Sequence, residues 1–243
     1  MSRDTLYAPE KTEPAPFEFN DDVARVFPDM LKRSIPGYAA SIQAIGTLAA
    51  NHVQPGSRCY DLGCSLGAAT LAMRRNIKAA GCRIIAVDNA PAMVNRCREL
   101  LDSDEQQTTT DVSIIEADIQ DVEITRASMV VMNYTLQFLP LEQRATLIRK
   151  IAKGMIAGGI LVLSEKVVND DPKIEKTLQD LHLEFKRRNA YSDLEISRKR
   201  AALENVLVPE SVSAHEQRLL DAGFSHIGVW LRYFNFISII AIR

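Results

Sequence analysis

The 243-residue sequence predicts an α/β domain built on a mostly parallel sheet with helices on both faces. Three observations support this fold class. Strand and helix patterns alternate from residue 58 onward, a glycine-containing turn joins the first strand to the next helix, and two consecutive strand patterns close the chain. Alternation of this kind is typical of successive strand–helix–strand units. We therefore expect one large domain over residues 21–243, with an insertion.

The region before the first strand predicts an arm and two helices. Residues 1–20 hold three prolines among charges and are expected to form a flexible arm that does not touch the ligand. Asp21 or Asp22 is expected to cap a short helix through Phe27, and residues 28–35 are expected to continue the chain to a Pro-Gly turn. A second helix is predicted from Tyr38 to about residue 54, and it should lie beside the first strand.

A turn of small residues follows the first strand and organises the predicted site. The strand ends at Asp61, and the turn contains Gly63, Cys64, Ser65 and Gly67. Glycine permits backbone torsions and a close ligand approach that a Cβ atom would forbid, and Asp61 adds an anionic group. This is where an α/β sheet binds a nucleotide-like ligand. The alternative is a glycine turn that binds nothing.

The turn differs from the two common phosphate-binding loops. Ser65 stands where the dinucleotide fingerprint has its second glycine, and no Lys-Ser/Thr pair follows, which excludes a P-loop. A ligand with a nucleoside but no phosphate fits this loop better.

The later strands end in polar residues. Strands are predicted over residues 83–88, 112–116, 128–133 and 160–164, and helices over residues 68–77, 91–101 and 142–155. Asp88 follows Gly63 by about 25 residues, and its carboxylate can accept hydrogen bonds from both hydroxyls of a ribose. Asn89 lies beside it, Asp118-Ile119 could meet an adenine edge, and Asn133 ends the fourth strand. The alternatives are a turn or cap role for Asp88 and a solvent-facing loop for Asp118.

The last third of the chain interrupts the alternation. Residues 170–205 are charged and helical, so we expect an inserted helical section over the ligand end of the sheet. A helix over residues 211–222 and two strands over residues 224–233 and 236–242 complete a seven-stranded sheet.

Composition excludes several classes of protein. A net charge of −2 offers no global attraction for nucleic acid or an anionic membrane. The four cysteines lack metal-ligand spacing and are expected to be reduced thiols near the core, with no metal site or disulfide framework. Without a signal peptide or a membrane-spanning run, we expect a cytoplasmic protein.

These residues together give the chain a resemblance to the class I S-adenosylmethionine (SAM)-dependent methyltransferase superfamily, whose Rossmann-like fold has a seven-stranded, mostly parallel sheet. A narrower set of motifs resembles the carboxy-S-adenosylmethionine synthase family. Those motifs are Val26–Met30, Arg33–Tyr38, Tyr60–Thr70, Thr135–Phe138, Leu163–Lys166, Glu195–Ser197 and Lys199-Arg200.

The resemblance implies an activity that composition does not reveal. Members of this family convert SAM and prephenate to carboxy-SAM and phenylpyruvate, and they act as homodimers without a metal. A separate enzyme uses the product to carboxymethylate wobble uridine in tRNA, so direct nucleic-acid binding is not expected here.

The resemblance also implies roles for site residues. Arg200 matches the carboxylate-binding arginine, which in the family comes from the neighbouring subunit, and Tyr38 matches another contact with the ligand. The SAM-contacting set is Tyr38, Asp61, Gly63, Cys64, Ser65, Asp88, Asn89, Asp118, Ile119, Asn133 and Arg200. From the residues alone, a solvated helix face is the favoured position for Arg200, and Tyr38 could be a core aromatic at the start of its helix. No general base is identifiable.

Two other functions remain open on sequence alone. A conventional SAM-dependent methyltransferase acting on a small molecule or RNA would carry the same loop. A noncatalytic SAM-binding module could use the basic runs at residues 186–188 and 198–200 to dock a partner or tRNA.

Overall fold

The computed structural model describes residues 2–8, 17–106, 108, 110–204 and 206–243. Its strands are β1 Arg58–Leu62, β2 Arg83–Asp88, β3 Asp111–Glu116, β4 Ala127–Asn133, β5 Met155–Val168, β6 Glu210–Ser211, β7 His226–Tyr233 and β8 Phe236–Ile242. Its helices are α1 Asp21–Ser34, α2 Tyr38–His52, α3 Ala68–Asn76, α4 Pro91–Asp102, the 3₁₀ turn η1 Leu136–Phe138, α5 Leu141–Gly154, α6 Pro172–Arg188, α7 Asp193–Leu203 and α8 Val212–Asp221.

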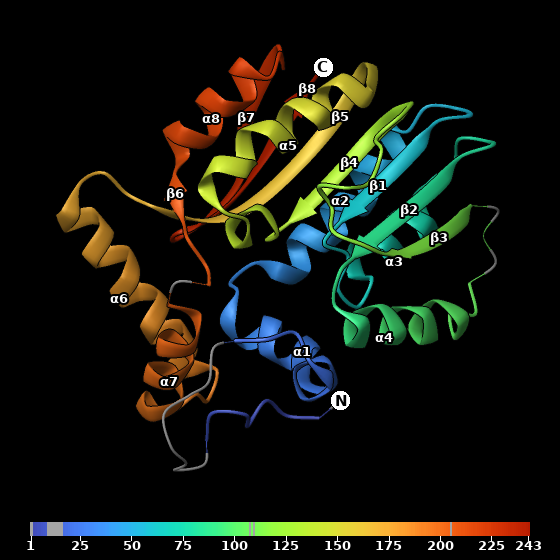
Figure 1. Ribbon diagram of the computed structural model, residues 1–243. Coiled ribbons are helices and arrows are strands. Elements are labelled where there is room, and N and C mark those ends of the chain that lie inside the picture. Colours follow the sequence, from blue (N-terminus) through green and yellow to red (C-terminus); the bar gives the residue numbers. More distant parts are fainter. Residues whose placement is uncertain (1, 9–16, 107, 109, 205) are drawn as a thin grey trace.

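The sheet has the order β3-β2-β1-β4-β5-β8-β7 (Figure 1). Strands β1 to β5 are parallel, whereas β8 is antiparallel to both β5 and β7. These seven strands confirm the predicted sheet, and the two-residue β6 adds a short parallel pairing with the end of β5. The strand order reverses between β1 and β4, which leaves a crevice at the carboxyl ends of these strands.

Alternate residues of the central strands face two different hydrophobic layers. Cys59 packs on the face that α2 and α3 cover, whereas Tyr60 packs with α5 and α8 on the opposite face. Because side chains alternate along a strand, Asp61 faces the α3 side. The same alternation places Lys166 and Glu165 on opposite faces of β5. The strand ends therefore present different side chains on the two faces of the sheet.

The first helix differs from the sequence prediction at its beginning. Asn20 is its N-cap, since the Asn20 side chain accepts a hydrogen bond from the Val23 N–H at 3.1 Å. The predicted caps Asp21 and Asp22 instead lie in the first turn, where their negative charges favour the positive end of the helix dipole. The helix continues through Pro28 without a break.

The described parts of the N-terminal arm are packed against the domain. Asp4 is buried, and Tyr191 donates a hydrogen bond to its carboxylate. The Phe17 N–H donates to the Ala202 carbonyl at 3.0 Å, so this part of the arm lies along α7. These contacts differ from the expected flexible arm over residues 1–20. Residues 9–16 lie outside the described residues.

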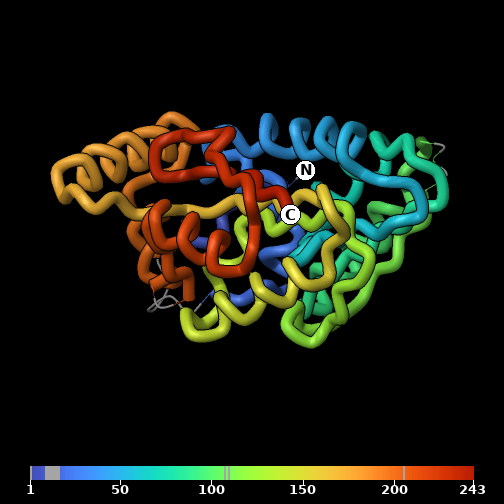
Figure 2. The backbone as a smooth tube through the Cα atoms, turned by 90° about the horizontal axis from the view of Figure 1, so that it is seen from above, coloured from blue at the N-terminus to red at the C-terminus, as the bar shows by residue number. Residues whose placement is uncertain are grey.

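The predicted helical insertion consists of α6 and α7, which lie beyond the carboxyl ends of the strands (Figure 1). Arg33 joins this section to α1, because its guanidinium donates to the carbonyls of Asn189 and Ala190, both at 2.7 Å. Helix α6 projects from one end of the molecule (Figure 2). Its apolar residues Ile174 and Leu181 are exposed.

Candidate functional site

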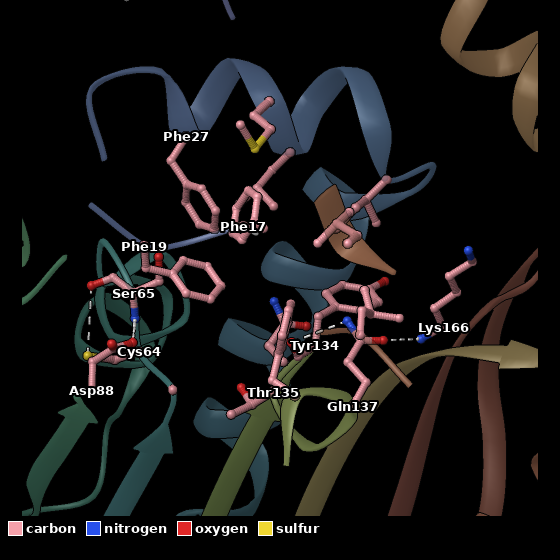
Figure 3. Close-up of a pocket in the computed structure, with 18 of the residues that line it drawn as sticks. Phe17, Phe19, Phe27, Cys64, Ser65, Asp88, Tyr134, Thr135, Gln137 and Lys166 are labelled. Carbon is pink, nitrogen blue, oxygen red and sulfur yellow. Dashed lines mark hydrogen bonds between the residues drawn. The ribbon is translucent and has the colours of Figure 1, made fainter. Parts of the chain in front are cut away.

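A cavity of about 330 Å³ opens at the carboxyl ends of the central strands, between the sheet and α1 (Figure 3). Ten residues predicted from the sequence line it: Tyr38, Asp61, Gly63, Cys64, Ser65, Asp88, Asn89, Asp118, Ile119 and Asn133. The fold thus brings together side chains from four successive strand ends, and their roles in binding stay predictions.

The glycine turn is fixed by backbone geometry. Gly63 has φ of 80°, and a Cβ atom there would lie 2.3 Å from Thr135 Oγ1. The Ser65 N–H donates to Asp88 Oδ2 at 2.8 Å, and Ser65 itself has φ of 50°. A positive φ in a serine stores strain, which surrounding contacts must hold. Asp88 therefore stabilises the turn of β1 from the tip of β2.

Asp61 is a buried carboxyl at the tip of β1. It is 1% exposed, and Thr70 Oγ1 donates to its Oδ2 at 2.6 Å. Burial raises the pKa of Asp61 to about 6; the Thr70 hydrogen bond opposes this shift and the charge of Asp88 adds to it. A cationic ligand beside Asp61 would favour the ionised form, since an opposite charge compensates for lost hydration.

Asp88 at the end of β2 and Asp118 in the loop after β3 form the rim of the cavity. Asp88 already accepts the Ala90 N–H on Oδ1 at 3.0 Å, but each carboxylate oxygen retains a further acceptor site. Asn89 Nδ2 donates to Asp118 Oδ1 at 2.6 Å, and both of these side chains are exposed. The rim therefore presents acceptors suited to ligand hydroxyl and amino groups.

Asn133 provides an acceptor that lacks a partner. Its Oδ1 is buried and forms no hydrogen bond, although Asn133 lines the cavity. Buried polar atoms in native proteins almost always have a partner, so this amide oxygen fits a ligand donor. Together with Asp61, it suits the amino and sulfonium groups of a SAM-type ligand.

Two tyrosines form the wall beside these strand tips. The rings of Tyr38 and Tyr134 have centroids 6.5 Å apart. Burial, and then the charge of Asp61, raise the pKa of Tyr38 well above its usual value, so this side chain remains a neutral phenol. Tyr134 has φ of 64° and is buried, which places its ring at the start of the loop after β4.

Buried hydrogen bonds of Glu165 and Arg144 hold that loop in place. Glu165 Oε1 accepts the Leu136 N–H at 3.0 Å, and burial raises the pKa of Glu165 to about 8. Arg144 is fully buried and donates to the Gln137 carbonyl at 3.1 Å and to Glu210. On the cavity side, the Lys166 N–H donates to Gln137 Oε1 at 3.0 Å.

The opposite end of the cavity is cationic. Lys166, Lys186 and Lys199 line it from β5, α6 and α7. Figure 3 shows Lys166 across the cavity from Ser65 and Asp88, with Phe17, Phe19 and Phe27 above. Sequence analysis identified the basic runs but assigned Lys186 and Lys199 no ligand role.

Helical spacing explains why Lys199 lies on the buried face of α7. Its neighbours on the buried face of α7 are Ile196 and Ala202, three residues to either side. Arg200 follows on the exposed side of α7 and does not line this cavity. Its assignment in the sequence analysis depends on a second copy of the chain, and it stays a prediction.

Sequence analysis also missed the aromatic residues of the N-terminal arm. Phe17 and Phe19 line the cavity, so the expectation that this arm does not approach the ligand is wrong for both residues. Their aromatic rings at the end of an arm rich in charged residues and proline were the available signal. One side of the cavity is therefore formed by Phe17 and Phe19, which precede α1.

Three further expectations concern cysteines, metals and membranes. All four cysteines are free and buried, as predicted. Among the described residues, no group of three or more His, Cys, Asp or Glu side chains could hold a metal ion. No helix within the described ranges has the length and apolar character needed to cross a bilayer.

Comparisons with known proteins agree with this fold. A family model described as a methyltransferase domain matches residues 60–159. Magnesium protoporphyrin IX methyltransferase from Synechocystis PCC 6803, solved with bound SAH, has a TM-score of 0.61 at 16% identity, covering 88% of this chain and 86% of that one. Human N-acetylserotonin methyltransferase in complex with SAM has a TM-score of 0.61 at 15% identity over 91% of this chain and 55% of that one. The fold is that of the class I SAM-dependent methyltransferases.

Curated relatives narrow this class to one family. The carboxy-S-adenosyl-L-methionine synthase of Geobacter sp. (strain M21) is 54% identical over 240 residues, which is 99% of this chain and 98% of that protein. The enzyme of the same name from Shewanella baltica (strain OS155) is 52% identical over 243 residues, covering 100% and 99%. The chain belongs to the carboxy-S-adenosyl-L-methionine synthase family. It is a transferase that uses SAM as substrate and forms carboxy-SAM.

Proposed function

We propose that this enzyme takes the carboxyl group of its product from prephenate and releases phenylpyruvate. The observation that carries the proposal is the charge distribution of the cavity. Asp61, Asp88 and Asp118 lie at one end, and lysines lie at the other. The acidic end suits the SAM cation, and the cationic end suits an organic acid beside it. A methyl donor alone would place no anion beside Lys166 and Lys186, which line the cationic end.

The proposed reaction is balanced without an additional reactant. The sulfonium methyl of SAM loses a proton, and its carbon forms a bond to CO2. Prephenate supplies this CO2 when the bond between its ring and the ring carboxyl breaks, and the ring becomes aromatic as its hydroxyl leaves. The methyl proton and the departing hydroxide form water. The products are carboxy-SAM, phenylpyruvate and water.

The side chains around the cavity suit a reaction that must exclude water. A carbanion beside the sulfonium would be reprotonated by solvent, so the site must be covered. Phe19 packs edge-to-face against Phe17, Phe27 and Phe138, with centroid separations of 5.0, 6.0 and 5.4 Å. Burial lowers the pKa of His182 to about 3, which leaves a neutral imidazole in contact with the Ser34 carbonyl at 2.8 Å. This histidine is a poor proton acceptor, so we assign no general base.

We further propose that the enzyme is a homodimer in which Arg200 reaches the partner's cavity and holds the new carboxylate. A planar guanidinium can donate two parallel hydrogen bonds to a carboxylate. An apolar stripe on α6 supports an interface, because Ile174 is 48% exposed and Leu181 is 43% exposed at a spacing of seven residues. Leu194 on α7 is also exposed.

The product would pass to a separate enzyme that carboxymethylates wobble uridine in tRNA. Such a role needs no direct contact between this chain and tRNA, which agrees with a net charge of −2. The proposal places the enzyme in the cytoplasm, where its substrates and tRNA meet.

Mass spectrometry tests the proposed reaction. Purified protein incubated with SAM and prephenate should form carboxy-SAM, with phenylpyruvate appearing in equal amount. Omitting prephenate provides the control. Unchanged SAM would contradict the choice of donor, and S-adenosylhomocysteine formed with another acceptor would favour a conventional methyltransferase.

A further inference from the structure

Lys166 and Lys186 are cationic groups in the cavity to which the established activity assigns no role. No hydrogen bond or ion pair of either ammonium group occurs among the described residues, although both side chains line the cavity. Lys199 differs, since its Nζ donates to Ser34 Oγ at 3.1 Å and lies 3.6 Å from Asp4 Oδ2. The fold therefore neutralises one lysine and leaves two to face the cavity.

The charges around these two lysines are mostly positive. Burial lowers the pKa of Lys186 to about 7, and the positive charges of Lys199, Lys166 and Arg200 add to this shift. The pKa of Lys166 is also lowered, first by burial. Glu175 is the acid that acts on Lys166, but its two oxygens accept hydrogen bonds from the Asn169 N–H at 2.8 Å and Gln179 Nε2 at 2.7 Å. Like charges gathered in a partly buried wall favour an anionic ligand.

The reaction of the donor determines which of its two carboxylates is suited to bind Lys166 and Lys186. A carboxylate that leaves as neutral CO2 loses its charge, so a bound ammonium would stabilise the substrate more than the transition state and slow the reaction. A carboxylate that is kept retains its charge throughout. Binding it lowers the KM without raising the barrier.

We propose that Lys166 and Lys186 bind the carboxylate that the organic-acid donor keeps, the one on its 2-oxo acid side chain, and thereby direct the departing carboxyl toward the sulfonium. This assignment rests on the proposed function. Phe19 and its neighbouring aromatic residues cover the donor's ring. The lysines are positioning residues for the reaction, and they also bind phenylpyruvate after CO2 has left.

Variants of the two lysines test this assignment. Lys166→Met and Lys186→Met should each raise the KM for prephenate roughly tenfold or more, because a partly buried charge pair is lost, and change kcat much less. The Kd for phenylpyruvate, measured by calorimetry on SAM-loaded protein, should rise by a similar factor. The Kd for SAM should stay within about twofold of the wild-type value. Lys186→Arg should restore most of the lost affinity.

Lys173→Met is the matched control, because Lys173 is an exposed lysine on the same helix as Lys186. It should leave all three constants unchanged. Should Lys186→Met fail to fold, Lys186→Gln keeps a polar end and provides the same comparison. Wild-type affinity for phenylpyruvate in both lysine variants would overturn the assignment, as would an equal loss of SAM affinity.

A pH series separates charge recognition from a merely structural role. The charges of Lys199, Lys166 and Arg200 all act on Lys186, and the charge of Lys186 in turn acts on His182, so the ammonium proton of Lys186 is weakly held without an anion. Phenylpyruvate binding should weaken as the pH rises from 6.5 to 9, and binding should take up protons at pH 8. Lys186→Met should flatten this profile. A wild-type profile without pH dependence would count against the assignment. Failure of the wild-type enzyme to form carboxy-SAM would instead contradict the proposed function.

Discussion

At the scale of single residues, ionising the buried carboxyl of Asp61 destabilises the fold, yet the same carboxyl is predicted to contact SAM. The folded-state pKa of about 6 lies above the unfolded value of 3.8. The folded protein therefore holds this proton more tightly, so the group's stabilising contribution is present at low pH and is lost as the pH rises through about 6. The ionised carboxyl is tolerated at neutral pH, where it can pair with a bound cation.

Asp61→Asn should therefore separate stability from binding. The amide still accepts the Thr70 hydrogen bond and carries no charge, so the ligand-free variant should be as stable as the wild type or more stable at pH 7.5. Its affinity for SAM should fall about tenfold, as expected for a lost charged hydrogen bond. Thermal unfolding and calorimetric titration would measure both.

The pH dependence of the wild-type protein checks the same residue. SAM binding should weaken below about pH 6, where Asp61 becomes protonated, and the Asn variant should lose this dependence. Asp111→Asn, at the exposed start of β3, is a control expected to change neither quantity. An Asn variant with wild-type SAM affinity would show that Asp61 has no part in binding.

Gly63 is a second residue whose role can be tested alone. Gly63→Ala should destabilise the fold by about 1 to 3 kcal/mol and abolish SAM binding, because φ is positive and the new Cβ would collide with Thr135. Denaturant unfolding and SAM titration provide the measurements.

A double variant and a control sharpen this prediction. Gly63→Ala combined with Thr135→Ala removes the collision but not the torsional strain, so it should recover only part of the lost stability. Gly228→Ala is the control, since apart from its chain neighbours no heavy atom of the described residues lies within 4 Å of its added Cβ. Equal effects of the substitutions at residues 63 and 228 would contradict the argument.

At the scale of elements, the beginning of α7 is fixed by a capping box. Ser192 Oγ accepts the Glu195 N–H at 3.2 Å, and Glu195 Oε2 accepts the Ser192 N–H at 2.8 Å. This motif determines where the helix starts and therefore which face carries Lys199. The element thus connects a local sequence signal to the cationic end of the cavity.

Ser192→Ala should lower stability by about 1 kcal/mol, the usual effect of losing an N-cap. In a chain of this length, we expect a decrease in Tm of roughly 2 to 4 °C. Ser197→Ala is the matched control: Ser197 is exposed on the same helix, and its hydroxyl donates to the Leu194 carbonyl within that helix. Equal Tm values for the Ser192 variant and the wild type would show that this cap does not contribute to the stability of the protein.

Element boundaries show where local signals were insufficient. Strand β5 begins at Met155, whereas the sequence predicted a strand from residue 160, because Gly158 and Gly159 resemble a turn. Met155 pairs with Ala127 of β4, and the register then shifts before Ile160 pairs with Met129. Gly158 has a positive φ within this irregular stretch, and its N–H donates to the Arg243 carbonyl at 3.0 Å. Asn20 was likewise missed as the cap of α1, since Asp21 and Asp22, one and two residues later, offered equally good side chains.

At the scale of the whole molecule, the proposed homodimer predicts that two defective chains can complement each other. Arg200→Ala should lack the carboxylate clamp, and Asp88→Ala should lack the ribose acceptor, so each homodimer should form little carboxy-SAM. A mixed dimer would contain one complete site, made of Asp88 from one chain and Arg200 from the other.

Mixing the two variants in equal amounts should restore about a quarter of the wild-type rate, because half of the dimers are mixed and each has one working site. Carboxy-SAM formation by mass spectrometry is the measurement, and each variant alone at twice the concentration is the control. No recovery, with mixed dimers demonstrated by native mass spectrometry, would show that Arg200 does not act across subunits.

Much of this protein could be predicted from its sequence because the determining signals are local. Strand periodicity, the glycine turn and the acids at successive strand ends follow directly from residue order, and they predicted the sheet. Together with the family motifs, they predicted ten of the residues that line the cavity. The same motifs indicated the family, which curated relatives confirm at up to 54% identity.

The tertiary structure alone decided how distant segments complete the cavity. Phe19 closes it from the N-terminal arm, and Lys186 reaches it from a helix more than 160 residues later, after β5 has carried the chain past the strand ends. Nor does local sequence distinguish Lys199, which Asp4 neutralises, from Lys166 and Lys186, which face the cavity. The sequence specifies which residues are charged, but their partners depend on which segments the packed core brings within a few ångströms.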